Sequence, residues 1–284
     1  MKTLLLSLLA LLSLSAQAAL TANIPQPEPL PPLYSYYRQL LTLALEKSGE
    51  DFTIHPVALN ETQPQLALKL RDGKPINLFW AGTTREYERQ LLPVRIPLLR
   101  GLSGFRLLLI NQTRQQEFSR VQSLSELASF TGVQGIGWGD IDILKQAGLN
   151  ISAAPSHTIL DMLNRNQQVD YYPRSLVEAH AELTTATAQY PLLMAEPRLL
   201  LHYPFAIYFF VSPEYPELAD ALTRGLDQAY RDGSFIALFE QYPPIRASLP
   251  VLQQSRLRLD LSNPDLTEST RTLPERYWHP GTRP

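Results

Sequence analysis

Residues in the segment 77–98 have the types and spacing that hold a small anion. An apolar stretch ends there in a turn formed by Gly82, Thr83 and Thr84, and a short helical segment carrying Arg89 follows. A strand-to-helix junction of this kind gathers backbone N–H groups, two hydroxyls and a guanidinium at one point. Arginine binds carboxylates through paired, charge-assisted hydrogen bonds. The spacing therefore predicts an anion-binding site that uses neither a metal nor a nucleophile.

Aromatic and basic residues elsewhere are further candidates for the same site. Trp80 lies near the end of the apolar stretch, where side-chain alternation directs it either to the site or to the core. Trp138 belongs to a glycine-rich turn, 135–140, and Tyr172 and Arg174 end an expected strand. We predict that these last three side chains approach the ligand from a second part of the molecule.

Most of these residues also have a purely structural interpretation. Arg89 can pair with an acidic neighbour on its own helix, and Thr84 can serve only as a helix N-cap. Arg174 can pair with Glu178 one helical turn further on. Both interpretations stay open at this point. The predicted ligand-binding residues are Trp80, Gly82, Thr83, Thr84, Arg89, Trp138, Tyr172 and Arg174.

Enzymatic chemistry finds little support in the sequence. The chain has no cysteine, which excludes thiolate nucleophiles, disulfides and thiolate metal sites. Its five histidines are scattered without the spacing of a metal site, and no Gly-x-Ser-x-Gly motif occurs. The turn 135–140 lacks the full Gly-x-Gly-x-x-Gly spacing of a nucleotide site. We predict no catalytic residue, no metal, no cofactor, and a protein that is not an enzyme.

The first eighteen residues have the pattern of a secretion signal. Lys2 precedes an apolar run, and Ala16 and Ala18 give a small-x-small cleavage site before Ala19. The run is too short to span a bilayer, so we expect a cleaved signal peptide (1–18), a periplasmic location and no membrane insertion. A formal net charge of −2 gives no reason to expect nucleic acid as a partner.

The rest of the chain alternates between strand and helix patterns, which predicts an α/β fold with mainly parallel sheets. Expected helices are 33–47, 65–70, 140–146, 157–164, 176–183, 216–231 and 234–242. Expected strands are 52–59, 76–81, 106–110, 133–137, 169–172 and 199–211. Two proline-dense or charged stretches, 24–32 and 250–284, are expected to lack regular structure.

The two longest apolar strand regions, 98–110 and 199–211, bracket about ninety residues that can form a unit of their own. Two α/β lobes joined by two hinge segments, with one cleft between them, would follow. We expect lobe 1 to contain 19–102 and 205–249, lobe 2 to contain 103–204, and 250–284 to pack on a lobe as a tail.

This organisation, with the motif at Ala81 to Arg89, resembles type II periplasmic solute-binding proteins, closest to the polar amino acid binders of ABC transporters. The motif matches at Ala81, Gly82, Thr84, Glu88 and Arg89. The resemblance implies that Thr84 and Arg89 hold the ligand's carboxylate on lobe 1. It also implies a monomer that captures a small-molecule solute in the interlobe cleft and delivers it to a membrane permease.

The sequence departs from that family where an aspartate pairs with the ligand's ammonium. Ser175 stands there beside Arg174, and Arg95 replaces a family serine. With no obvious carboxylate opposite, the cleft is expected to prefer a small anionic ligand to a zwitterion. Two alternatives stay open: a dehydratase-like enzyme on the same scaffold, with Glu86 as its acid or base, and a sensory or scaffolding domain whose cleft is vestigial.

Overall fold

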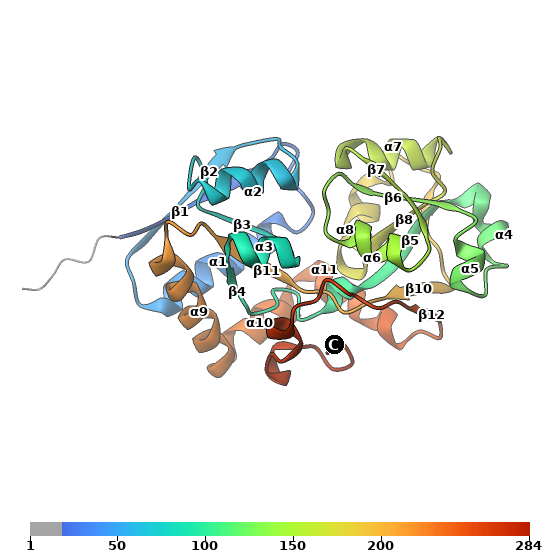
Figure 1. The fold of residues 1–284 in the computed structure, drawn as a ribbon. Coiled ribbons are helices and arrows are strands. Elements are labelled where there is room, and N and C mark those ends of the chain that lie inside the picture. Colours follow the sequence, from blue (N-terminus) through green and yellow to red (C-terminus); the bar gives the residue numbers. More distant parts are fainter. Residues whose placement is uncertain (1–18) are drawn as a thin grey trace, which may run out of the picture.

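The computed structural model describes residues 19–284, which form two α/β lobes with a C-terminal segment running beneath both (Figure 1). This confirms the predicted fold class. The expected signal peptide lies outside the described residues. Within 19–284, no helix combines the length and the apolar character that crossing a membrane requires.

Lobe 1 consists of five strands and of the helices that cover them. Its strands are β1 (Leu20–Gln26), β2 (Phe52–Ala58), β3 (Leu78–Gly82), β4 (Leu92–Val94) and β11 (Ile207–Val211). Its helices are α1 (Tyr34–Ser48), α2 (Gln63–Arg71), α3 (Arg85–Gln90), α9 (Pro216–Arg231) and α10 (Ser234–Gln241).

Lobe 2 denotes the second group. Its strands are β5 (Phe105–Asn111), β6 (Thr131–Gly135), β7 (Asn150–Ala154), β8 (Tyr171–Ser175), β9 (Leu193–Ala195), β10 (Leu199–His202) and β12 (Leu257–Asp260). Its helices are α4 (Gln115–Phe118), α5 (Leu124–Leu127), α6 (Asp140–Gln146), α7 (Ile159–Asn164) and α8 (Leu176–Ala186). Two short helices, α11 (Pro243–Ser248) and α12 (Glu268–Arg271), flank β12 in the sequence.

Lobe 1 has a three-stranded sheet in the order β3-β11-β4 and a parallel pair, β1-β2. The buried Asn77 joins the two, because its amide donates to the Thr21 carbonyl at 2.7 Å and its side-chain oxygen accepts from the Asn23 N–H at 2.8 Å. The expectation of no regular structure in 24–32 is wrong at its start. β1 reaches Gln26 because it pairs with β2 up to Gln26, which stands opposite Ala58.

The sheet of lobe 2 runs β12-β10-β5-β8-β6-β7, with β9 also paired to β5. The expected mainly parallel character is wrong, since β5 is antiparallel to β8, β9 and β10. The expected strand 199–211 is divided into β10 and β11. Pro204 lies in the break and has no N–H to give to a sheet.

Two hinge segments join the lobes, between β4 and β5 and between β10 and β11. They are tied to each other by a hydrogen bond from the Leu98 N–H to the Ile207 carbonyl at 2.9 Å, and by one from Tyr203 to Gly104 at 3.1 Å. The Ser103 hydroxyl also donates to the Phe205 carbonyl at 3.1 Å. The two crossings therefore form one connected hinge.

The C-terminal segment 250–284, expected to lack regular structure, contains β12 and α12 and contacts both lobes. β12 pairs in parallel with β10 of lobe 2. The chain then passes the hinge, where the Asn263 amide donates to the Pro204 carbonyl at 2.8 Å. It ends on lobe 1, where Trp278 is 2% exposed within the core cluster around Phe79. The boundaries expected for the lobes as folding units stay predictions.

Candidate ligand-binding site between the lobes

The junction of β3 and α3 has the geometry that its sequence predicts. Thr84 is the N-cap of α3, and its hydroxyl accepts from the Tyr87 N–H at 3.1 Å. Gly82 needs its small size, since a Cβ there would lie 2.1 Å from the Phe205 ring of the hinge. The Thr83 hydroxyl donates to Glu88 at 2.7 Å. Both hydroxyls predicted to face a ligand therefore already have a partner within lobe 1, Thr83 as a donor and Thr84 as an acceptor.

Arg89 is exposed on α3 and forms no ion pair among residues 19–284. The carboxylate nearest to it in sequence, Glu88, instead pairs with Arg95 at 3.2 Å and accepts from Thr83 and from Thr267 of the C-terminal segment. Arg89 is thus not held by a structural partner. Its predicted role toward a ligand stays a prediction.

Trp80 lies in an aromatic cluster on lobe 1. Its ring centroid is 5.4 Å from that of Tyr34 and 5.2 Å from that of Tyr37, both on α1. Tyr34 and Tyr37 are buried, and the Tyr34 hydroxyl has no hydrogen-bond partner in the described part of the chain, 19–284. The cluster offers apolar ring surface beside polar atoms, which suits an amphipathic ligand.

The glycine-rich turn of lobe 2 lies directly against lobe 1. A Cβ on Gly139 would be 2.7 Å from the Thr84 methyl group, and one on Gly137 would be 2.2 Å from Pro64 of α2. Val177, on the first turn of α8, belongs to the core cluster of lobe 1. The lobes are therefore in close contact at the face where a ligand was expected.

Arg174 is buried and neutralised by two carboxylates of α8. Its guanidinium is 3.2 Å from Glu178 and 2.6 Å from Glu182. It also lies over the rings of Trp138, at 4.7 Å, and Tyr172, at 5.3 Å. The structural interpretation of Arg174, an ion pair with Glu178 one helical turn further on, is therefore present in the structure, and Glu182 adds a second carboxylate from α8.

A second buried arginine, Arg106 at the start of β5, was not predicted. Its guanidinium is 3.1 Å from Asp140, the first residue of α6, and both side chains are almost fully buried. The same Asp140 oxygen accepts from the Tyr203 hydroxyl and the Gln134 amide, each at 2.8 Å. The sequence signal was an arginine inside an apolar strand, which rarely occurs without a partner.

Tyr37 of lobe 1 meets the charges of lobe 2. Burial raises the pKa of the Tyr37 hydroxyl well above its usual value, and the negative charge of Glu178 raises it further, while Arg174 and Arg106 oppose this. Although burial disfavours its charge, Glu178 and Glu182 keep the pKa of Arg174 well above normal. Arg174 and Arg106 therefore stay positively charged, and the Tyr37 hydroxyl near them stays neutral.

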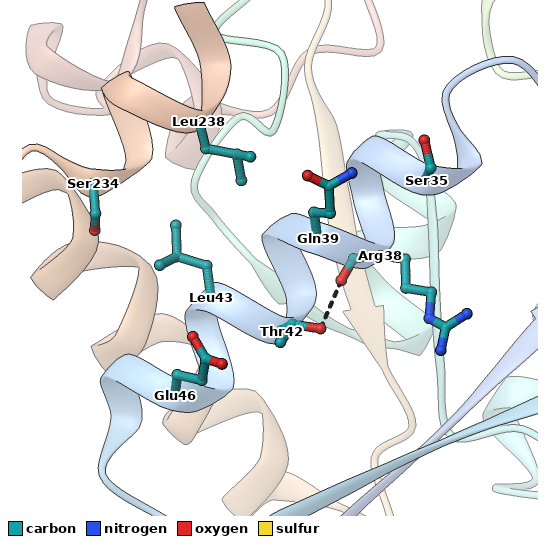
Figure 2. Close-up of a pocket in the computed structure, with 8 residues that line it drawn as sticks. All are labelled: Ser35, Arg38, Gln39, Thr42, Leu43, Glu46, Ser234 and Leu238. Carbon is teal, nitrogen blue, oxygen red and sulfur yellow. Dashed lines mark hydrogen bonds between the residues drawn. The ribbon is translucent and has the colours of Figure 1, made fainter. Parts of the chain in front are cut away.

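Two hollows lie elsewhere on the surface. One, of about 450 Å³, opens between α1 and α10, where Leu43 and Leu238 point toward each other (Figure 2). The other, of about 350 Å³, lies between Arg85 and the region of α12. Neither is lined by Trp80, Trp138 or the buried arginines, so the residues that combine charge with burial remain those between the lobes.

No family model matches the sequence, and no curated protein sequence matches it either. Solved structures do match. An ancestral arginine-binding protein bound to arginine has a TM-score of 0.61 at 14% identity, covering 78% of this chain and 98% of that one. A histidine kinase sensor domain with similarity to periplasmic binding proteins has a TM-score of 0.59 at 12% identity, covering 80% and 96%.

A putative L-cystine ABC transporter protein from Listeria monocytogenes matches with a TM-score of 0.55 at 12% identity, covering 80% of this chain and 98% of that one. The fold is accordingly that of type II periplasmic binding proteins. At these identities the likeness establishes the fold alone, because the scaffold carries transport and sensory proteins alike.

Proposed function

We propose that the protein is a periplasmic solute-binding protein that captures a small polar solute between its lobes. The observation that carries this proposal is the set of buried charges at the edge of lobe 2 that faces lobe 1. Arg106, Arg174 and Glu178 act on the Tyr37 hydroxyl of lobe 1, and Asp140 pairs with Arg106. Moving charged groups from water into the protein interior costs free energy. A set of buried charges therefore favours a role beyond folding.

The charges favour a solute that brings groups of both signs. Arg174 has two carboxylates against it, and Arg106 has Asp140, so the site is not a purely cationic one. This replaces the expectation of an anion without an amine. The aromatic cluster of Trp80, Tyr34 and Tyr37 would cover the apolar part of the solute. A carboxylate or amino-acid-like molecule has these features.

Capture requires the lobes to separate and then to close on the solute. The contacts of Gly139 with Thr84 and of Gly137 with Pro64 belong to the closed arrangement. A ligand favours closure only through contacts that are better in the closed state. Contacts with Trp80 on one lobe and with Trp138 and Arg174 on the other would meet that condition.

Calorimetry and thermal unfolding with a panel of amino acids and small carboxylates test this function. A ligand present at a hundred times its dissociation constant stabilises the folded chain by about 2.7 kcal/mol. We expect such a shift with at least one zwitterionic compound. If no compound of either class shifts the unfolding transition, the proposal of solute capture is wrong and a sensory or scaffolding role gains support.

Delivery of the solute to a membrane permease belongs to the same proposal and follows from the likeness to transporter proteins. The enzyme alternative rests on Glu86. That side chain is exposed and accepts from the Gln90 amide at 3.2 Å. A general acid or base is usually placed in a buried or strongly charged setting. We therefore favour binding over catalysis.

A further inference from the structure

Arg106 has a hydrogen-bonding group that the fold leaves unused. Its side chain is 4% exposed, and its Nε atom has no hydrogen-bond partner among residues 19–284. A guanidinium carries five N–H donors, and an unpaired donor in a buried position destabilises the fold. The ion pair with Asp140 engages a different nitrogen, Nη2. The ion pair therefore leaves the Nε donor available to a further partner.

The setting of Arg106 is suited to an anion. In the pairing of β5 with β8, Arg106 stands directly opposite Ser175, which is the N-cap of α8. The dipole of this eleven-residue helix places positive charge at its N-terminus, where the Ser175 hydroxyl accepts from the Glu178 N–H at 3.3 Å and the earlier N–H groups have no partner within the helix. The register therefore places Arg106, with its partner Asp140, next to the N-terminus of α8, whose first turn also carries Glu178.

Its surroundings exclude water and fix the guanidinium. The rings of Tyr203 and Phe205 lie 5.3 and 5.2 Å from it, and both belong to the hinge segment. Tyr37 of lobe 1 lies close enough to Arg106 for the positive charge of the guanidinium to lower the pKa of the Tyr37 hydroxyl. A charge-assisted hydrogen bond is strongest in such a dry, rigid environment. Opening of the lobes would uncover the arginine from the side of lobe 1.

We propose that Arg106, with the N-terminus of α8, binds the acidic group of the solute. The solute is then anchored first on lobe 2, and lobe 1 closes over it. This reverses the expectation that Thr84 and Arg89 hold the acid on lobe 1. The inference rests on the proposed function, and it predicts that an acid binds better than the matching neutral amide.

The test measures the affinities of acid and amide pairs by calorimetry, using L-glutamine with L-glutaminamide and succinate with succinamide. The wild-type chain should bind the acid of a pair more tightly. Arg106→Lys keeps the charge beside Asp140 but loses the planar fork of donors, so the acid-to-amide preference should fall roughly tenfold or more. A merely structural role would weaken the acid and the amide equally.

Arg114→Lys is the matched control, because Arg114 is also an ion-paired arginine of lobe 2 but lies at the opposite end of β8, against Asp170. The acid-to-amide preference of Arg114→Lys should equal that of the wild type. If Arg106→Lys does not fold, the double variant Arg106→Gln with Asp140→Asn replaces it. The ratio of its affinities for acid and amide should fall to near one.

Two results overturn the inference. One is an unchanged preference in the Arg106 variants. The other is loss of the preference in Arg89→Ala, which would place the acid on lobe 1. Wild-type protein that binds neither member of either pair, nor any compound of the wider panel, contradicts solute capture itself and removes this inference with it.

Discussion

The Thr267 hydroxyl of the C-terminal segment donates to the Glu88 carboxylate of α3 at 3.0 Å. Thr270 and Thr83 donate to the same oxygen, at 3.2 and 2.7 Å, and the Glu88 side chain is only 5% exposed. The C-terminal segment, which pairs with lobe 2 through β12, is therefore also hydrogen-bonded to α3 of lobe 1.

Removing this acceptor should destabilise the protein. Glu88→Ala leaves three hydroxyls without a charged acceptor, so we expect the free energy of unfolding to fall by about 2 to 3 kcal/mol, measured by urea denaturation. Glu86→Ala on the same helix is the control, and because Glu86 is exposed its effect should stay within about 0.5 kcal/mol. Equal effects of the two substitutions would contradict a stabilising role of the hydrogen bonds between Glu88 and the C-terminal segment.

Trp278 should anchor the end of the chain on lobe 1. It is 2% exposed, so Trp278→Ala should lower the free energy of unfolding by about 3 to 5 kcal/mol. Its indole N–H has no hydrogen-bond partner within the residues that the structure describes, so Trp278→Phe removes an unsatisfied donor while keeping most of the packing. We expect the Phe variant to lose less than about 1.5 kcal/mol. A small loss in the Ala variant would mean that the segment is not docked in solution.

The contact between Gly139 and Thr84 should couple the two lobes energetically. Gly139→Ala places a methyl group 2.7 Å from the Thr84 methyl, which should cost about 1 to 3 kcal/mol. In the double variant, Thr84→Ser removes the opposing methyl while keeping the N-cap hydroxyl, so most of that loss should be recovered. Purely additive effects in this double-mutant cycle would show that the lobes stand apart in solution.

Stability should fall at mildly acidic pH because of His202. Burial lowers the pKa of this histidine below its ordinary value of about 6.5. The folded state therefore favours the neutral ring, and the unfolded chain binds more protons between the two pKa values. Stability is kept above about pH 6.5 and decreases as the pH falls through that window.

His202→Gln should reduce the slope of melting temperature against pH between pH 7 and 5. Burial also lowers the pKa of His279, so part of the slope should remain in the single variant. The Nδ1 atom of His202 lies 2.8 Å from Asp260 of β12, which links the effect to the C-terminal segment. Superimposable pH profiles of variant and wild type would exclude His202 as the cause.

Local patterns were enough to predict the long elements. α9 begins and ends where proline, apolar spacing and the Asp232-Gly233 stop place it, and α6 matches its expected range of 140–146. β1 and β12 were missed. In β1 polar residues and one proline interrupt the apolar residues, and in β12 charged residues do. Such strands form only when a partner strand is already present.

The sequence by itself determined the two-lobed α/β scaffold and the Thr84 N-cap, because helix periodicity, capping and apolar strands depend on residues close together in the chain. Only the tertiary structure decided which charges meet. Arg106 reaches Asp140, thirty-four residues away, and Arg114 reaches Asp170, fifty-six residues away. Coulombic partners and burial depend on how strands are ordered and on where the lobes touch, and a linear pattern carries neither.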